Sequence, residues 1–395
     1  MSPVEGEPVK ARVPKVAEGK SANGKAANLP PPRLCVCGAG NAGAAIAADC
    51  ALGGLEVALF ELPRFRAGLQ TILDRGGITL TPDSDPVWGK TGFARLARIT
   101  TDPAEALADA QVVMITVPAM YHSAFWDILA THLADGQIVL FNTGYHGCLR
   151  HARKLEQVEA RVTLAESNIM PYLCSKTGDT VHIDRHKRHF RVAAFPGNRS
   201  AEVYKVLRLI YPQYEKVDHV LDSNIASGGN PAFHVTLTIP IAGFYFDRYR
   251  GGKFYSDTTV QGGRLIEAYD RERETLCRQL GSLAFQSTLE FDRRSYEYDG
   301  KDIVSLLRRS EHIDWFASAA YLKQVCEEDI LFAYIPMVLL AEQLGLRMPV
   351  TRSMVEIFAA MLGESYWERG VTPTQLGIDG MDTSQLLTYI TEGSR

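Results

Sequence analysis

The chain has 395 residues, a formal net charge of −4 and an isoelectric point near 6.2. A domain usually holds about 100 to 200 residues, so this length predicts two domains and a tail. Lysines and arginines are scattered and form no basic stripe, so we expect no nucleic-acid partner. The N-terminus lacks a hydrophobic signal core, and no run approaches the roughly 18 apolar residues of a membrane span. We therefore expect a cytoplasmic protein without a membrane partner.

The N-terminal residues 1–32 are rich in Lys, Ala, Gly and Pro and end in a triple proline. Such a segment buries too little surface to fold, so we predict a disordered extension. The chain has seven cysteines, an odd number, and three of them (Cys35, Cys37 and Cys50) fall in the first strand and helix. Disulfide bonds there would distort a buried strand, which favours a reducing compartment. We predict no metal site.

A short apolar run meets a G-x-G-x-x-G turn and continues as an alanine-rich helix. The turn and its first helical residues are Gly38, Ala39, Gly40, Asn41, Ala42 and Gly43. Gly38 allows the tight turn, Gly40 leaves room for a pyrophosphate, and Gly43 lets helix and strand pack closely. The backbone N–H groups of the helix N-terminus, at Asn41 and Ala42, would bind the phosphates. The pattern predicts a dinucleotide-binding turn, the alternative being a glycine turn without a nucleotide.

The second apolar run, Leu55 to Phe60, ends at Glu61, which lies 23 residues after Gly38. A carboxylate at this place usually accepts the ribose hydroxyls and would repel the 2′-phosphate of NADPH. Arg64 and Arg66 follow closely and could bind that phosphate instead. The sequence therefore favours NAD(H), with NADP(H) open.

Further strands extend this first domain. One ends at Val117 and Pro118, at the carboxyl edge of the sheet where α/β folds bind ligands, so we take both as cofactor contacts. The strand from Gln137 to Phe141 runs into Thr143, a candidate substrate contact, although a simple turn explains it nearly as well. The alternation of strands and helices predicts a doubly wound, Rossmann-type α/β domain over 33–214.

From about Val217 the apolar spacing becomes helical, with long segments such as 258–281 and 318–344. The sequence therefore predicts a mostly α-helical substrate and catalytic domain over 215–395. An exposed apolar helical face in this domain would allow a homodimer.

The densest polar group of the second half is the segment Asn230-Pro231-Ala232-Phe233-His234. A histidine that opens an apolar helix just after the crossover between domains is placed to face the cleft above a nicotinamide. A hydrogen-bonded core histidine is an equal alternative. Asn230 is a candidate substrate contact, or else the cap of the helix that begins near Pro231.

These residues resemble the octopine and nopaline (opine) dehydrogenases, whose helical domain opens with N-P-x-x-H and later carries an E-D dipeptide. The matching residues are Asn230, Pro231, His234 and the pair Glu328-Asp329. The resemblance implies that His234 and Asp329 form a catalytic dyad, and their separation of 95 residues fits the family spacing.

The resemblance continues through short matches in the same order, from about Arg33 to the segment Gln375-Leu376-Gly377. They are Val117-Pro118-Ala119 with His122, Ala165-Glu166 with Met170-Pro171-Tyr172, Val192 to Pro196, and Leu344-Gly345-Leu346 with Pro349. By this resemblance, Tyr172 lies near the amine pocket. The family tends to have an arginine five residues before the dyad aspartate, suited to clamping a carboxylate, and Gln324 stands there. We take Gln324 as a substrate contact. The segment Ile330 to Tyr334 also departs from the family, which usually has a proline and a Tyr-Gly pair.

The chemistry that the dyad suits is proton transfer near neutral pH. Condensation of an amine with a 2-oxo acid passes through a carbinolamine and an imine, and each step moves protons, as a histidine can. An ionised Asp329 in contact would favour the imidazolium form and fix its tautomer. The resemblance thus implies an NAD(P)H-dependent enzyme that joins an amino acid and a 2-oxo acid, with His234 as acid and base.

Two other interpretations stay open. A ketopantoate- or 3-hydroxyacid-type keto-reductase would reduce a carbonyl without an amine, but such folds usually place a lysine with an asparagine in the helical domain, and His234 has no lysine nearby in the sequence. A non-catalytic regulatory protein would keep the fold and bind NAD without turnover.

Overall fold

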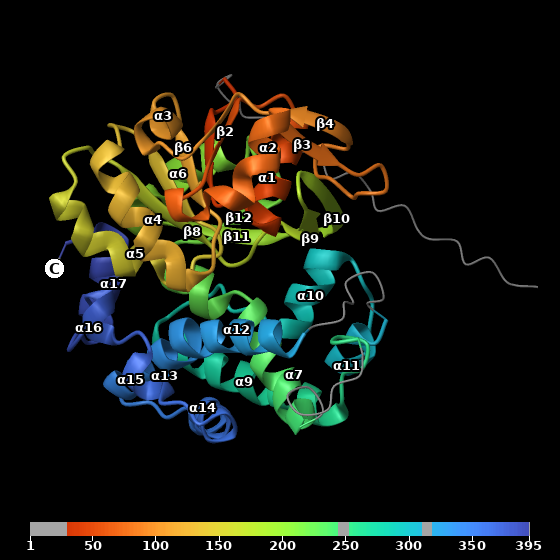
Figure 1. Cartoon of the computed structure of the whole chain (residues 1–395). Helices are drawn as coiled ribbons and strands as arrows, with labels where there is room; N and C mark the ends of the chain where they lie inside the picture. Colours follow the sequence, from red (N-terminus) through yellow and green to blue (C-terminus); the bar gives the residue numbers. More distant parts are fainter. Residues whose placement is uncertain (1–29, 244–252, 310–317, 395) are drawn as a thin grey trace, which may run out of the picture. The chain divides into compact units, whose positions relative to one another are not determined.

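The computed structural model describes residues 30–243, 253–309 and 318–394 (Figure 1). Apart from its last three residues, the predicted disordered extension, 1–32, lies outside the described residues. From Pro31 onward the chain is one compact unit. In Figure 1 the strands belong to its red-to-green first half, and helices make up most of the green-to-blue second half. The predicted class, an α/β domain followed by a helical one, is confirmed.

The main sheet has eight strands among the described residues, in the order β12-β11-β8-β7-β6-β1-β2-β5. All neighbours in it are parallel except β11 and β8. The order β5-β2-β1-β6-β7-β8 is that of a doubly wound dinucleotide-binding sheet, which confirms the Rossmann-type prediction. The strands are β1 (Leu34–Cys37), β2 (Val57–Phe60), β5 (Arg98–Thr100), β6 (Val112–Ile115), β7 (Ile138–Phe141), β8 (Thr163–Ser167), β11 (Phe190–Phe195) and β12 (Tyr214–Lys216).

Short helices accompany this sheet, whose central strands are fully buried as expected for strands covered on both faces. Asp102 caps α3 by accepting the N–H groups of Ala104 and Glu105, and Pro103 opens that helix. The helices of the first half are α1 (Asn41–Leu52), α2 (Gln70–Arg75), α3 (Pro103–Leu107), α4 (His122–Leu129), α5 (Gly147–Ala152) and α6 (Ser200–Leu207).

The second half is helical throughout its described part, and most of its longer helices carry an N-cap side chain. Thr259, Ser287, Ser318 and Asp382 each accept a backbone N–H at a helix start. Its helices are α7 (His234–Thr238), α9 (Val260–Gln279), α10 (Thr288–Tyr296), α11 (Ile303–Leu307), α12 (Ala319–Asp329), α13 (Ile335–Gln343), α14 (Pro349–Leu362), α15 (Tyr366–Arg369), α16 (Pro373–Leu376) and α17 (Thr383–Glu392), with a π-helical turn, η10 (Ile330–Tyr334), between α12 and α13.

The last two helices return to the first half. Helix α16 packs against α5, and α17 packs against the turn that follows β11. The rings of Phe195 and Tyr389 meet edge to face, with centroids 5.3 Å apart. Ile390 is fully buried in the same apolar cluster as Phe195. Residues of α17 thus complete the apolar core of the first half.

A second, four-stranded sheet lies against α1, in the order β4-β3-β10-β9. Its strands are β3 (Gly77–Leu80), β4 (Gly92–Arg95), β9 (Tyr172–Thr177) and β10 (Thr180–His186). The fully buried Asp49 of α1 joins the two layers. Its carboxylate accepts the N–H groups of Val87 and Trp88 at 2.9 and 3.2 Å and the hydroxyl of Tyr172 at 2.5 Å. Since both oxygens have donors, this buried carboxylate is well solvated by the protein.

Replacing Asp49 by Ala should destabilise the fold by roughly 3–5 kcal/mol, because two buried N–H groups and a buried hydroxyl lose their acceptor. Asp49→Asn keeps one acceptor oxygen and should cost less. Urea unfolding followed by circular dichroism measures both changes. A loss within about 0.5 kcal/mol for Asp49→Ala, the range of an ordinary surface substitution, would show that this contact does not hold the layers together.

Candidate functional site

The glycine turn has the geometry that a dinucleotide requires. Gly38 has a φ of +104°, which favours glycine, and a Cβ on Gly43 would lie 1.8 Å from the Gly38 carbonyl oxygen. A Cβ on Gly40 would meet no atom within 4 Å. Gly40 is also the N-cap of α1 and offers no side chain to the N–H groups of Asn41 and Ala42. This open space at a helix N-terminus fits a pyrophosphate.

Glu61 follows β2 and points back at the glycine turn. One carboxylate oxygen accepts the N–H of Ala39 and the other accepts the N–H of Leu62, both at 2.8 Å. The carboxylate is thus fixed beside the place where the adenosine ribose would bind. Arg64 is exposed, and its guanidinium carbon lies 5.0 Å from the centroid of the Phe65 ring. In the described part of the chain, no hydrogen bond holds its side chain to the glycine turn.

The loop after β6 packs on the same turn. The hydroxyl of Thr116 donates to the Cys37 carbonyl at 2.8 Å, and the Val117 side chain fills the space beside Gly38, where an added Cβ would lie 2.5 Å from it. Pro118 follows at the carboxyl edge of the sheet. Val117 and Pro118 therefore flank the predicted cofactor site.

The two predicted catalytic residues, 95 positions apart, meet in the structure. His234 is the first residue of α7 and Asp329 the last of α12. His234 Nδ1 and Asp329 Oδ2 are 2.9 Å apart. Asp329 is fully buried, and His234 is 7 % exposed. The carboxylate thus holds one imidazole nitrogen in a water-poor site.

Tyr145 is a site residue that the sequence analysis missed. Its hydroxyl donates to Asp329 Oδ1 at 2.6 Å and also contacts the Asn230 side chain. Burial, assisted by the nearby carboxylate of Asp329, holds the pKa of Tyr145 well above its usual value, so the residue stays a hydroxyl donor. The only local sequence signal for Tyr145 was its position directly after Thr143-Gly144, in the loop that follows β7.

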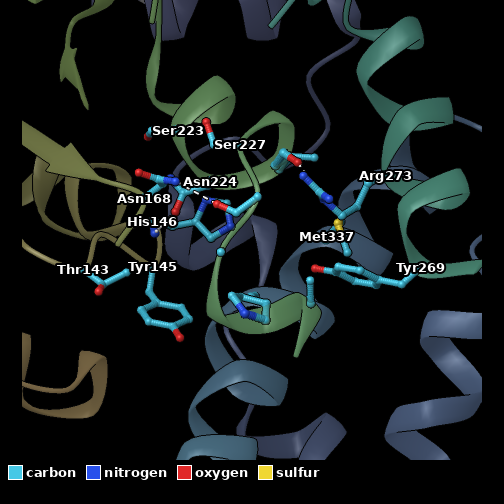
Figure 2. Close-up of a pocket in the computed structure, with 16 residues that line it drawn as sticks. Thr143, Tyr145, His146, Asn168, Ser223, Asn224, Ser227, Tyr269, Arg273 and Met337 are labelled. Carbon is cyan, nitrogen blue, oxygen red and sulfur yellow. Dashed lines mark hydrogen bonds between the residues drawn. The ribbon is translucent and has the colours of Figure 1, made fainter. Parts of the chain in front are cut away.

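A small pocket of mixed polar and apolar residues includes Tyr145 (Figure 2), which joins it to the dyad through the hydrogen bond to Asp329. Thr143 and Tyr145 line it from the first half, and Pro231, Tyr269 and Arg273 line it from the second. Its other lining residues are His146, Asn168, Ser223, Asn224, Ile225, Ser227, Gly228, Gly229, Ala232, Ala333 and Met337. The pocket thus opens between the halves on the side of the Asn230–Ala232 turn.

Of the four predicted substrate residues, only Thr143 lines this pocket. Asn230 stands in sequence between the lining residues Gly229 and Pro231, and its side chain contacts Tyr145. The other two lie elsewhere. Tyr172 is buried in β9, where its hydroxyl bonds to Asp49 and to Tyr211, because the β9 end packs on α1 rather than on the helical half. Gln324 is exposed on α12. Five residues before Asp329, it lies on a different side of the helix, one turn before Glu328.

A buried carboxylate supports the loop that carries Thr143 and Tyr145. Glu166, in β8, accepts the N–H of Cys148 at 3.2 Å and the side-chain amide of Asn224. A Cβ on Gly144 would lie 2.8 Å from the Glu166 side chain, so the loop rests directly on it. Burial raises the pKa of Glu166 to about 7.

This raised pKa predicts a pH-dependent contribution to stability. The folded state keeps the Glu166 proton to about pH 7, whereas the unfolded chain loses it near pH 4.5, so the contribution is complete below 4.5 and is lost as the pH rises through 7. Relative to wild type, Glu166→Gln should therefore gain on the order of 3 kcal/mol between pH 4 and pH 8. Urea unfolding of both proteins across this range measures the difference. A difference independent of pH would contradict the prediction, since a lost acceptor gives only a constant offset.

Among the described residues, no cluster of three or more His, Cys, Asp or Glu side chains has the arrangement of a metal site. No helix in the described ranges combines the length and the apolar character that crossing a bilayer demands. All seven cysteines are free thiols.

Known proteins share both the helical half and the fold. Residues 216–362 match the family described as NAD/NADP octopine/nopaline dehydrogenase, alpha-helical domain. An opine dehydrogenase of Arthrobacter sp. (strain 1C) is 25% identical over 364 residues, which cover 90% of this chain and 98% of that protein.

Solved structures of the same fold include an octopine dehydrogenase in complex with NADH and agmatine, with a TM-score of 0.72 and 16% identity. They also include a yersinopine dehydrogenase with NADP+ bound, with a TM-score of 0.62 and 15% identity. Each match covers 92% of this chain and 98% of the other. The helical half thus matches the octopine/nopaline dehydrogenase family model, and similarity to an opine dehydrogenase runs along nearly the whole sequence, so the chain is an NAD(P)-dependent oxidoreductase.

Proposed function

We propose that this enzyme joins the amine of an amino acid to a 2-oxo acid and reduces the resulting imine to an N-(1-carboxyalkyl)amino acid, or runs the reverse reaction. The observation that carries the proposal is the contact between His234 Nδ1 and Asp329 Oδ2, beside the pocket and within the half that matches the opine family. The substrates are thus small molecules, an amino acid and a 2-oxo acid.

The proton chemistry follows from which atoms of the dyad are engaged. Because Asp329 holds Nδ1, the His234 nitrogen left to exchange a proton with substrate is Nε2. In the basic form it takes a proton from the attacking amine, and in the acidic form it donates one to the departing hydroxyl of the carbinolamine. Tyr145, on the second oxygen of Asp329, prevents the carboxylate from rotating away from the imidazole.

The glycine turn, Glu61, Val117 and Pro118 would hold the cofactor. The reduced nicotinamide, when bound, supplies the hydride. Thr143 lines the pocket and the Asn230 side chain contacts Tyr145, which supports keeping both as candidate substrate contacts.

Oxidation of NADH and NADPH over a grid of amino acids and 2-oxo acids tests the reaction. We expect oxidation that requires both partners, and we expect His234→Ala to lower kcat by roughly 10² to 10⁴, the usual contribution of a general acid or base. His132→Ala, which removes an exposed histidine of the first half, is the matched control and should keep wild-type turnover. Oxidation with a carbonyl compound alone would indicate a keto-reductase. Cofactor binding with no oxidation across the grid would favour a regulatory protein.

We also propose that NADH is preferred over NADPH. The Glu61 carboxylate is held beside the glycine turn by two backbone N–H groups, so a 2′-phosphate would meet a fixed negative charge. The KM for NADPH should exceed that for NADH by about tenfold or more, and Glu61→Ser should shrink this ratio. Glu56→Ser, which alters an exposed carboxylate just before β2, should leave the ratio unchanged. A lower KM for NADPH in the wild type would overturn the proposal.

We further propose that the enzyme acts in the cytoplasm and forms a homodimer. Free thiols persist in reducing compartments, so the seven free cysteines support action in the cytoplasm. Ile357 and Met361, one turn apart on α14, are both exposed apolar residues and are the face through which a homodimer could form.

A further inference from the structure

The backbone of Ala119 (the Ala119 peptide), meaning its N–H and its carbonyl in two successive peptide groups, is held by two ionisable residues that are distant in sequence. Its N–H donates to Glu328 Oε1 at 2.6 Å, and its carbonyl oxygen accepts from Arg150 Nη1 at 3.1 Å. Glu328 belongs to α12 of the helical half, whereas Arg150 belongs to α5 of the first half. A residue whose backbone donor and backbone acceptor are both engaged cannot slide along either helix without breaking a hydrogen bond.

Arg150 is itself held by the segment that follows the dyad. Its guanidinium lies over the Phe332 ring, 4.5 Å from the ring centroid, and Phe332 belongs to the π-helical turn three residues after Asp329. Burial lowers the pKa of Arg150 only to about 10, partly because the carboxylates of Glu166 and Glu328 oppose the shift. Arg150 is therefore a cation at neutral pH and closes a ring of contacts through Ala119, Glu328 and Phe332.

This ring of contacts spans the two parts of the proposed active site. On one side, Ala119 lies two residues after Val117, whose side chain packs beside Gly38 of the cofactor turn. On the other side, Glu328 is the direct chain neighbour of Asp329. A displacement of the Ala119 peptide therefore changes the spacing between the cofactor turn and the dyad.

We propose that Glu328 and Arg150 are positioning residues, which set the distance between the cofactor and His234 by holding the Ala119 peptide between them. This inference rests on the proposed function for its catalytic readout. Hydride transfer and proton transfer both depend on distances between bound groups, and a misplacement of about 1 Å can cost roughly 10²-fold in rate.

The acceptor on Glu328, rather than its charge, is what holds the Ala119 N–H. Burial raises the pKa of Glu328 to about 7, and either protonation state keeps an oxygen able to accept this hydrogen bond. A glutamine at 328 also has such an oxygen and nearly the same length. Glu328→Gln should therefore preserve the positioning that Glu328→Ala removes.

The test compares kcat, KM and cofactor affinity in these variants. Glu328→Ala should lower kcat by about 10- to 100-fold while changing the KM values of the two substrates much less, and Glu328→Gln should recover most of the loss. Glu327→Gln is the matched control. Glu327 is the neighbouring carboxylate and accepts the Tyr366 hydroxyl at 3.0 Å, a contact that glutamine can keep, so wild-type kcat is expected.

A double-mutant cycle tests whether the two charged residues act on one peptide. Arg150→Ala should also lower kcat, and the Glu328→Ala, Arg150→Ala double variant should lose clearly less than the product of the two single losses, because either change already frees the peptide. Phe332→Leu, which removes only the stack on Arg150, should give a smaller loss in the same direction. It keeps the proposal testable if a charge-removing variant does not fold.

Cofactor binding separates this inference from the proposed reaction. Titration with NADH, followed by its fluorescence, should show weaker binding to Glu328→Ala than to Glu327→Gln even if no substrate pair is turned over. Equal NADH affinity and equal kcat in folded Glu328→Ala and Glu327→Gln proteins would overturn the positioning role. If the two single losses in kcat multiply in the double variant, Glu328 and Arg150 act independently. That result would overturn the Ala119 backbone as their shared target.

Discussion

The structure of the active region depends on one constraint, the burial of the Asp329 carboxylate. Burying an ionised carboxylate is costly unless each oxygen is engaged by a donor. The protein meets this requirement with His234 on one oxygen and the Tyr145 hydroxyl on the other. These two residues come from the start of α7 and from the loop after β7, so the loop of the first half and two helices of the second must converge on Asp329. The convergence that solvates the carboxylate also assembles the proposed catalytic group.

The neighbouring Glu328 carries out a different task with the same chemistry. Its side chain binds the backbone N–H of Ala119 after β6, whereas the Asp329 side chain binds His234 of α7 and Tyr145 of the loop after β7. The side chains of consecutive residues on a helix differ in direction by about 100°, so the two carboxylates of an E-D dipeptide can bind different partners. One carboxylate of the pair is thus part of the dyad and the other contacts the loop beside the cofactor turn.

Much of this arrangement could be predicted from local pattern, and the remainder depends on partners far along the chain. The spacing of Gly38, Gly40 and Gly43 follows from the geometry of one turn. The structure shows close packing at Gly43 and open space at Gly40, as that geometry requires. The pairing of His234 with Asp329 was accessible only through resemblance. Tyr145 and its acceptor are 184 residues apart, and Ala119 and Glu328 are 209 apart, so no local spacing signals either pair. The short motif around Tyr172 does not indicate which helix β9 packs against, and the structure places its hydroxyl on Asp49 of α1.

The return of α17 to the first half bears on the order in which the protein can be completed during synthesis. Domains generally fold from the N-terminus as the chain emerges. Here Phe195 packs on Tyr389, and Ile390 shares its apolar cluster, so the sheet that carries the cofactor turn lacks part of its core until α17 has been made. A ribosome-bound first half would expose that apolar surface to solvent until α17 packs on it.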